Sequence, residues 1–267
     1  MDAPQILADV SEHVGTITLN RPEAMNALHG DMREVLLAIL EGFASDRRVR
    51  SVVVTGAGKA FCAGGDIAAM AERQGEEDTS GMDRTLVTVG RVLHQLRGMP
   101  QPVVAAVNGA AAGGGMNLAL ACDMRLGSEN TLFAQSFVKI GLVPDWGGFA
   151  FLTRLVGTAK AMEIMMLGER IGAEEAHRLG LLNRLLPANG FMDQVREFAG
   201  RLAAGPPETL AAIKRGVYLG ADASLAEVLA YEHRSQRTAF LSDDAREGIR
   251  AFLEKRPPRF GSGGNGG

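Results

Sequence analysis

The sequence predicts an α/β core followed by a helical segment. Two stretches each predict a strand, a glycine-rich turn and a helix in that order, and the strands are apolar runs typical of strands covered on both faces. From Gly148 onward strand signals mostly disappear and helical spacing dominates. The 267 residues are 46% hydrophobic and 22% charged, which suits one large domain or a domain with a small appendage.

The chain begins with a predicted hairpin, because residues 6–10 and 16–19 alternate apolar and polar side chains. Asp31 is a candidate N-cap for the amphipathic helix that follows it. Residues 51–55 are a continuous run rich in β-branched side chains, which predicts a buried strand.

Two glycine-rich turns carry the strongest functional signal. The first, residues 61–67 (FCAGGDI), precedes a predicted helix at 66–70, and the second, residues 110–115 (AAAGGG), lies between an apolar strand at 103–107 and a helix at 116–121. A helix N-terminus directs free backbone N–H groups and partial positive charge at a ligand, and glycines let that ligand approach closely. Because ligands bind at the carboxyl ends of strands in such sheets, the turns predict a site for an anion or a polarised carbonyl oxygen. The alternative is a tight turn that only packs a helix against a sheet.

The remaining elements follow from the same patterns. The polar run 74–81 predicts a loop, strands are expected at 123–127 and 132–134, and 182–186 is expected to be extended. Helices are expected at 85–96, 149–156, 159–166, 173–179, 191–203, 208–219, 224–238 and 243–255.

A hinge-like Gly205-Pro206-Pro207 separates two of the predicted helices. The tail, residues 261–267, has no apolar side chain and is expected to be disordered. We therefore divide the chain into a core, residues 1–200, a helical C-terminal region, residues 201–260, and this tail.

Composition excludes several classes of protein. A net charge of −3 argues against a nucleic-acid partner, and no apolar run is long enough to span a membrane. The five histidines show no metal-ligand spacing, and neither a GxSxG element nor a P-loop is present, so no metal site is expected. No leader opens the sequence, and Cys62 and Cys122 are expected to be free buried thiols, which together predict a cytoplasmic location.

Several motifs in order resemble the enoyl-CoA hydratase/isomerase (crotonase) superfamily between about Ile6 and Phe260. They are Asn20-Arg21-Pro22 with Asn26-Ala27-Leu28, the turn 61–67, the run from Ala105 to Gly115, Ala121-Cys122-Asp123, and the ending from Glu247 to Arg256. The resemblance implies a crotonase-like spiral of ββα turns with a C-terminal helical trimerisation region, and a homotrimer or dimer of trimers. It also implies an acyl thioester of coenzyme A as the substrate and no separate cofactor.

The resemblance assigns the two turns a chemical role. It implies that the backbone amides of Gly65 and Gly114 bind the thioester oxygen, where negative charge builds when a neighbouring proton is removed. Each such donor contributes roughly 3 kcal/mol in the transition state. The flanking residues expected to contact substrate are Ala63, Asp66, Ile67 and Gly113.

Hydratases of the superfamily use two glutamates, and the matching positions here hold Asn117 and Phe137. Neither side chain holds and deprotonates water as a syn addition requires, so ordinary hydratase activity is not expected. Both are candidate pocket residues, although Asn117 has the alternative of a helix-surface position.

Asp145 stands where isomerases of the superfamily carry an aspartate, and the run 133–145 is most similar to the ring-1,2-epoxyphenylacetyl-CoA isomerases. One carboxylate can take a proton from one carbon and return it to another. The apolar neighbours Phe137, Val143 and Trp146 are expected to raise its pKa above about 4. The alternative for Asp145 is an N-cap of the helix that begins near Gly147.

Coenzyme A contacts are less clearly marked. Ala68 stands where relatives often carry a lysine near the phosphates. The resemblance implies that Arg21 lies near the adenine and that Lys255 reaches a neighbouring subunit's nucleotide, with solvated surface charges as the alternative. Trp146 either lines the acyl pocket or belongs to the core.

The sequence thus predicts an acyl-CoA isomerase that shifts a double bond or rearranges a ring through an enolate held by the two amides. Two alternatives stay open. The first is a divergent enoyl-CoA hydratase or a thioester hydrolase in which Asp145 directs water, and the second is a non-catalytic acyl-CoA-binding protein.

Overall fold

A six-stranded sheet forms the centre of the molecule, in the order β1-β2-β3-β5-β7-β10. The computed structural model describes residues 3–74 and 79–261. The strands of this sheet are β1 (Ile6–Ser11), β2 (Val14–Leu19), β3 (Ser51–Gly56), β5 (Val103–Val107), β7 (Met124–Ser128) and β10 (Arg184–Leu186). The first two form the predicted antiparallel hairpin, and the others pair in parallel.

A second sheet of four short strands lies beside the first, in the order β4-β6-β8-β9. Its strands are β4 (Ala60–Cys62), β6 (Ala110–Ala112), β8 (Leu132–Ala134) and β9 (Arg170–Gly172). Each of β4, β6 and β8 directly follows a strand of the large sheet, and a helix comes next in the chain. This repeated strand-strand-helix unit confirms the expected ββα spiral.

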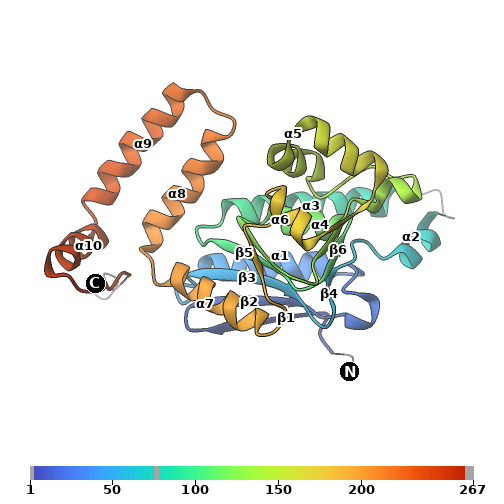
Figure 1. Ribbon diagram of the computed structural model, residues 1–267, viewed down its shortest axis with the longest axis horizontal. Coiled ribbons are helices and arrows are strands. Elements are labelled where there is room, and N and C mark those ends of the chain that lie inside the picture. Colours follow the sequence, from blue (N-terminus) through green and yellow to red (C-terminus); the bar gives the residue numbers. More distant parts are fainter. Residues whose placement is uncertain (1–2, 75–78, 262–267) are drawn as a thin grey trace.

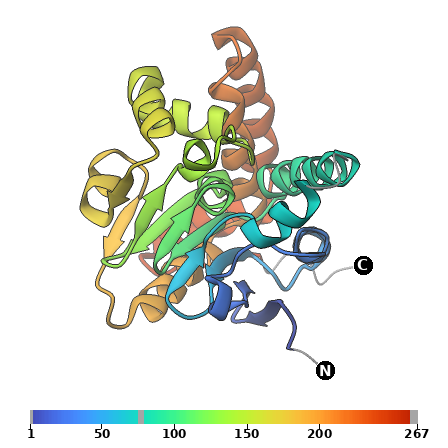
Figure 2. The same cartoon turned by 90° about the vertical axis from the view of Figure 1, so that its right-hand side faces the viewer.

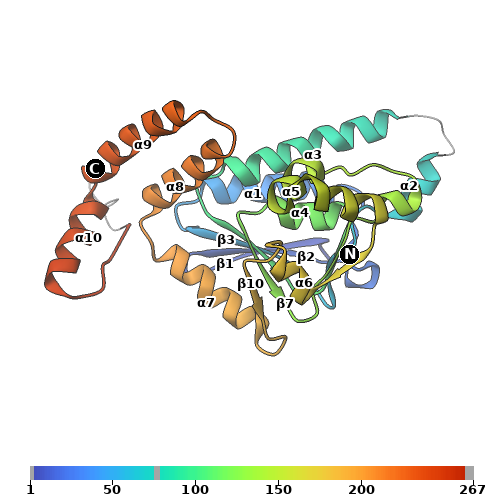
Figure 3. The same cartoon turned by 45° about the horizontal axis from the view of Figure 1, so that its top comes forward.

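Helices cover both faces of the large sheet because its inner strands are apolar on both sides. Val52 and Val54 join the larger core cluster, which α1 (Met32–Ser45) and α3 (Ser80–Gly98) cover. Val53, which points to the opposite face, packs with the apolar side of α7 (Phe191–Ala203). Figure 3 shows α1 and α3 on one side of the sheet and α7 on the other.

The remaining helices of the core are short or interrupted. They are η1 (Pro22–Ala24), α2 (Ile67–Gln74), α4 (Gly114–Ala121), η2 (Ser136–Ile140), α5 (Gly148–Leu167) and α6 (Ala173–Arg178). Within α5, Gly157 has a φ of 76°, which breaks the helix between the two segments that the sequence predicts.

Three helices leave the core as an arm, which comprises α8 (Pro207–Gly220), α9 (Leu225–Phe240) and α10 (Asp243–Glu254) (Figure 1). Figure 2 views the molecule from the α2 side and shows the arm behind the core. The arm starts at Gly205-Pro206-Pro207, the predicted break between two helices. Lys214 anchors α8, because its Nζ donates to the carbonyl oxygens of Leu96 and Gln101 and pairs with Asp123 at 2.8 Å.

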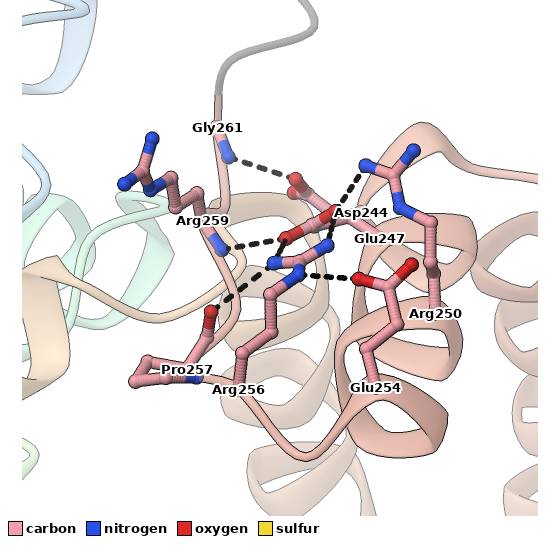
Figure 4. Close-up of polar contacts among 8 residues, drawn as sticks. All are labelled: Asp244, Glu247, Arg250, Glu254, Arg256, Pro257, Arg259 and Gly261. Carbon is pink, nitrogen blue, oxygen red and sulfur yellow. Dashed lines mark hydrogen bonds and ion pairs between the residues drawn. The ribbon is translucent and has the colours of Figure 1, made fainter.

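The C-terminal segment after α10 returns toward the core. Glu247 accepts hydrogen bonds from the Arg256 and Arg250 guanidiniums and from the Arg259 amide (Figure 4). These arginine contacts hold the pKa of Glu247 well below its usual range. Arg50, in the loop before β3, donates to the carbonyl oxygens of residues 260 and 261 and so joins this segment to the core.

Several predicted details need correction. Strand β9 was not predicted, and β4 and β6 overlap the residues assigned to the glycine turns, since three residues are too few to show a periodicity. Asp31 precedes α1 but its side chain makes no capping hydrogen bond. Within the predicted loop 74–81, Gln74 ends α2 and Ser80 begins α3, while residues 75–78 lie outside the described residues, as do 262–267 of the predicted tail. In the described ranges, no helix combines the length and apolar character needed to cross a membrane.

Candidate active site

The two glycine turns lie against each other because β4 and β6 are parallel neighbours. A Cβ on Gly64 would lie 3.2 Å from the Gly114 nitrogen, and one on Gly115 only 2.1 Å from the Cys62 carbonyl oxygen. Gly64 also has a φ of 92°, which a residue with a side chain rarely adopts. These glycines therefore serve close packing, and that packing brings the two turns to one place.

Two backbone amides remain unused where the turns meet. Within the described part of the chain, neither the Gly65 nor the Gly114 amide donates to a protein acceptor. Gly114 is the first residue of α4, so its free N–H is one of those a helix N-terminus leaves unpaired. The Gly113 amide, by contrast, donates to the Ala134 carbonyl oxygen at 2.8 Å. The turns thus offer donors at Gly65 and Gly114 for an oxygen ligand.

Asp145 is half-buried beside the second turn, and one oxygen of its carboxyl group is fully buried. Its Oδ1 is 3.6 Å from the position a Cβ of Gly114 would take, and this buried oxygen has no protein hydrogen-bond partner. Burial raises the pKa of Asp145, and the positive charge of Arg33 opposes that shift only in part. The N-cap of α5 is Gly147, with no side-chain capping bond, so the interpretation of Asp145 as the cap is wrong.

A pair of buried amide side chains fixes the backbone of Asp145. The Asn117 Nδ2 donates to the Asp145 carbonyl oxygen at 2.8 Å, and the Gln135 Nε2 donates to the Asn117 Oδ1 at 2.6 Å. Both amides are fully buried, so Asn117 is not a helix-surface residue. Gly148 permits the contact, because a Cβ there would lie 2.4 Å from the Asn117 Nδ2. Sequence reasoning missed Gln135, whose signal is a polar residue directly after the apolar strand β8.

Two aromatic rings pack against the second turn. The Trp146 Cδ1 lies 2.9 Å from the Cβ position of Gly114, and the Phe137 ring lies 3.5 Å from that of Gly113. Trp146 is 3% exposed and packs in the main core, so it contributes to the core and also borders the turn. Val143 is 73% exposed, so its predicted part in the apolar setting of Asp145 is wrong.

Comparison with known proteins assigns the family. The family model described as enoyl-CoA hydratase/isomerase matches residues 9–263. The chain is a member of the enoyl-CoA hydratase/isomerase family, within the crotonase superfamily. It is 44% identical to a probable enoyl-CoA hydratase of Rhodobacter capsulatus (94% of this chain, 96% of the relative) and 36% identical to the 1,2-epoxyphenylacetyl-CoA isomerase of Escherichia coli (96% and 97%). A solved enoyl-CoA hydratase from Polaromonas sp. JS666 superposes with a TM-score of 0.92 at 35% identity, covering 96% of this chain and 99% of that one.

The first turn of this crotonase-superfamily chain carries an ion-pair cluster. Asp66 pairs with Arg21 at 3.2 Å, the His29 Nδ1 lies 3.4 Å from the same carboxylate oxygen, and Arg21 also donates to the Ala27 carbonyl oxygen. Burial raises the pKa of Asp66, but the Ala69 amide and Arg21 outweigh it, so the pKa lies below its usual value. The Arg21 guanidinium is therefore engaged with protein groups next to the turn.

The other predicted binding residues lie at different distances from the turns. Ala63 is half-buried in the first turn, whereas Ile67 and Ala68 are exposed at the start of α2. The Met70 Cε, which sequence reasoning did not consider, lies 2.2 Å from the position a Cβ of Gly65 would take. Lys255 is the C-cap residue of α10, and Figure 1 shows that α10 lies on the arm, away from β4 and β6. In residues 3–74 and 79–261 no three His, Cys, Asp or Glu side chains gather to hold a metal.

Proposed function

We propose that this chain is an acyl-CoA isomerase, which shifts a double bond or rearranges a ring in an unsaturated acyl-CoA through an enolate. The observation that carries the proposal is the position of Asp145. Its carboxyl group has a buried oxygen without a protein partner, next to a turn whose amide is free. The relative named 1,2-epoxyphenylacetyl-CoA isomerase supports this choice within the family.

The proposed reaction moves one proton. The thioester oxygen accepts hydrogen bonds from the Gly65 and Gly114 amides, and the Asp145 carboxylate removes a proton from a carbon next to the unsaturated system. The electron pair delocalises onto the thioester oxygen, where each amide contributes about 3 kcal/mol to the transition state. Asp145 then returns the proton to a different carbon. Burial of the carboxyl group favours both steps, since a raised pKa makes it a better base and keeps its protonated form available.

Hydration is the competing activity, and it is favoured by the many relatives named as hydratases. The structure of the site argues against it as the main reaction. The Asn117 side chain is bonded to Asp145 and Gln135, and Phe137 offers no group that activates water. Asp145 is the one acidic side chain that the described site places beside the second turn.

Product analysis tests the proposal. Purified protein is incubated with a 2-enoyl-CoA and with a 3-enoyl-CoA. The products are separated by chromatography, and their molecular masses are measured by mass spectrometry. Interconversion without a change of mass supports the isomerase. Gain of one water indicates a hydratase, release of free coenzyme A indicates a thioester hydrolase, and tight binding without turnover indicates a non-catalytic acyl-CoA-binding protein; each of these contradicts the proposal.

We also propose that the chain works as a homotrimer or a dimer of trimers, with Lys255 reaching a neighbour's coenzyme A. The arm exposes large apolar side chains, among them Leu225, Phe252 and Leu253 at 72%, 83% and 74% exposure, which an assembly would cover. Light scattering tests the assembly, and a monomer at assay concentration would contradict it.

A further inference from the structure

A basic cleft of about 380 Å³ lies where the arm joins the core, between the end of α3, the first half of α5 and α8. Arg97, Arg154 and Arg215 line it, one from each of these three helices, and His94 of α3 lines it as well. Asp222 supplies the carboxylate among the described lining residues. In Figure 3, α3 and α8 meet at this end of the core, whereas α2 lies at the opposite end of α3.

Positive charge in the cleft is only partly neutralised. Both oxygens of Asp222 accept from the Arg154 Nη2, at 2.8 and 3.0 Å, so the carboxylate is committed to one guanidinium. In the described part of the chain, the Arg97 and Arg215 side chains donate no hydrogen bond to a carboxylate or carbonyl oxygen. Arg97 and Arg215 therefore have no hydrogen-bonded anionic partner, although Asp123 attracts the Arg97 guanidinium through space.

Arg97 is held in place although it lacks such a partner. Its Cζ lies 3.5 Å from the Tyr218 ring centroid and 4.9 Å from that of Phe151. The Tyr218 hydroxyl in turn donates to Asp123, whose other oxygen pairs with Lys214. Burial lowers the pKa of Arg97, which reflects the cost of keeping this charge half-buried. The guanidinium is thus oriented in advance, and a counter-anion would offset its desolvation.

We propose that this cleft binds a phosphate-class oxyanion between Arg97 and Arg215. The planar guanidinium presents paired N–H donors that match the oxygens of phosphate, and a tetrahedral anion has enough oxygens to bond groups from both sides of the cleft. Because Arg97 belongs to the core and Arg215 to the arm, the anion stabilises the position of α8. The proposal is independent of the chemistry at Asp145.

Thermal unfolding tests this site. Full-length protein, free of coenzyme A, is unfolded in inorganic phosphate and in chloride at equal pH and ionic strength. A saturable rise of about 3 °C is expected when phosphate exceeds its dissociation constant ten-fold. Isothermal titration with phosphate is expected to give about a ten-fold weaker affinity for Arg97→Gln and for Arg215→Gln, as for the loss of one charge-assisted bond.

Arg91→Gln is the matched control, because it removes the same charge from an exposed position on α3 and is expected to bind phosphate like the wild type. Arg215 is exposed, so Arg215→Gln is expected to fold normally, and its phosphate affinity can be measured even if Arg97→Gln folds poorly. An equal phosphate response in all four proteins, or no saturable response in the wild type, overturns the proposal. Isomerase turnover is expected to be unchanged in Arg215→Gln, which separates this site from the proposed function.

Discussion

Asp145→Asn is expected to leave the fold intact and remove the activity. The carboxyl Oδ1 has no protein partner and does not cap α5, so an amide of the same shape breaks no hydrogen bond of that oxygen. Because burial raises the pKa of Asp145, the folded protein binds this proton more tightly than the unfolded chain. Ionised Asp145 therefore costs stability at neutral pH, and the cost disappears as the pH falls below its ordinary pKa of about 3.9.

The variant is thus expected to melt at the same temperature as the wild type or higher at pH 7, with the difference vanishing near pH 4. Loss of the general acid-base group is expected to lower kcat by about 10²–10⁴-fold. Isomerisation is followed by chromatography of the acyl-CoA products. The matched control is Asp9→Asn, because it makes the same substitution at an exposed position of β1. Retention of more than about a tenth of the activity, or a melting temperature several degrees lower, would refute the reasoning.

Three further predictions follow from contacts around the site and the arm. Gly114→Ala keeps the amide donor but places a Cβ 2.9 Å from the Trp146 ring, so kcat/KM is expected to fall by about 100-fold. An unchanged kcat/KM would show that the Trp146 ring moves aside without displacing the amide. Gln135→Leu leaves the Asn117 Oδ1 without its donor, so urea unfolding is expected to show a loss of about 1–3 kcal/mol with kcat reduced more than KM is raised. Glu247→Gln weakens the arginine contacts, so the C-terminal segment is expected to be cleaved faster in limited proteolysis at pH 7. In the wild type these contacts persist until the pH falls below the carboxyl's usual range, and equal cleavage rates at pH 7 would contradict their role.

Elements with a clear periodicity could be predicted from the sequence. Helix α7 has the predicted bounds, residues 191–203, because its apolar spacing repeats over three turns. The break in α5 at Gly157 was visible as a gap between two helical runs. Of the four-stranded sheet, only β8 was predicted, at residues 132–134. The strands β4, β6 and β9 are three residues long, and their pairing depends on partners distant in the chain.

The candidate site shows the same division. Glycine turns mark positions where the backbone comes close to other groups, so the meeting of the two turns followed from the sequence. The residues that surround Asp145 were predicted only in part, because the exposure of a side chain depends on tertiary packing. Val143 is exposed to solvent, while Asn117 and Gln135 are buried. A side chain's hydrogen-bond partner across 28 residues, as between Asn117 and Asp145, likewise requires the folded structure.

A structure with an unreactive acyl-CoA analogue bound tests the central claim most directly. The account predicts that the thioester oxygen lies about 2.7–3.1 Å from both the Gly65 and the Gly114 nitrogens. It also predicts that the Asp145 carboxyl group faces the carbons between which the proton moves. A thioester oxygen bound away from either amide, or an acyl chain that does not approach Asp145, would contradict it.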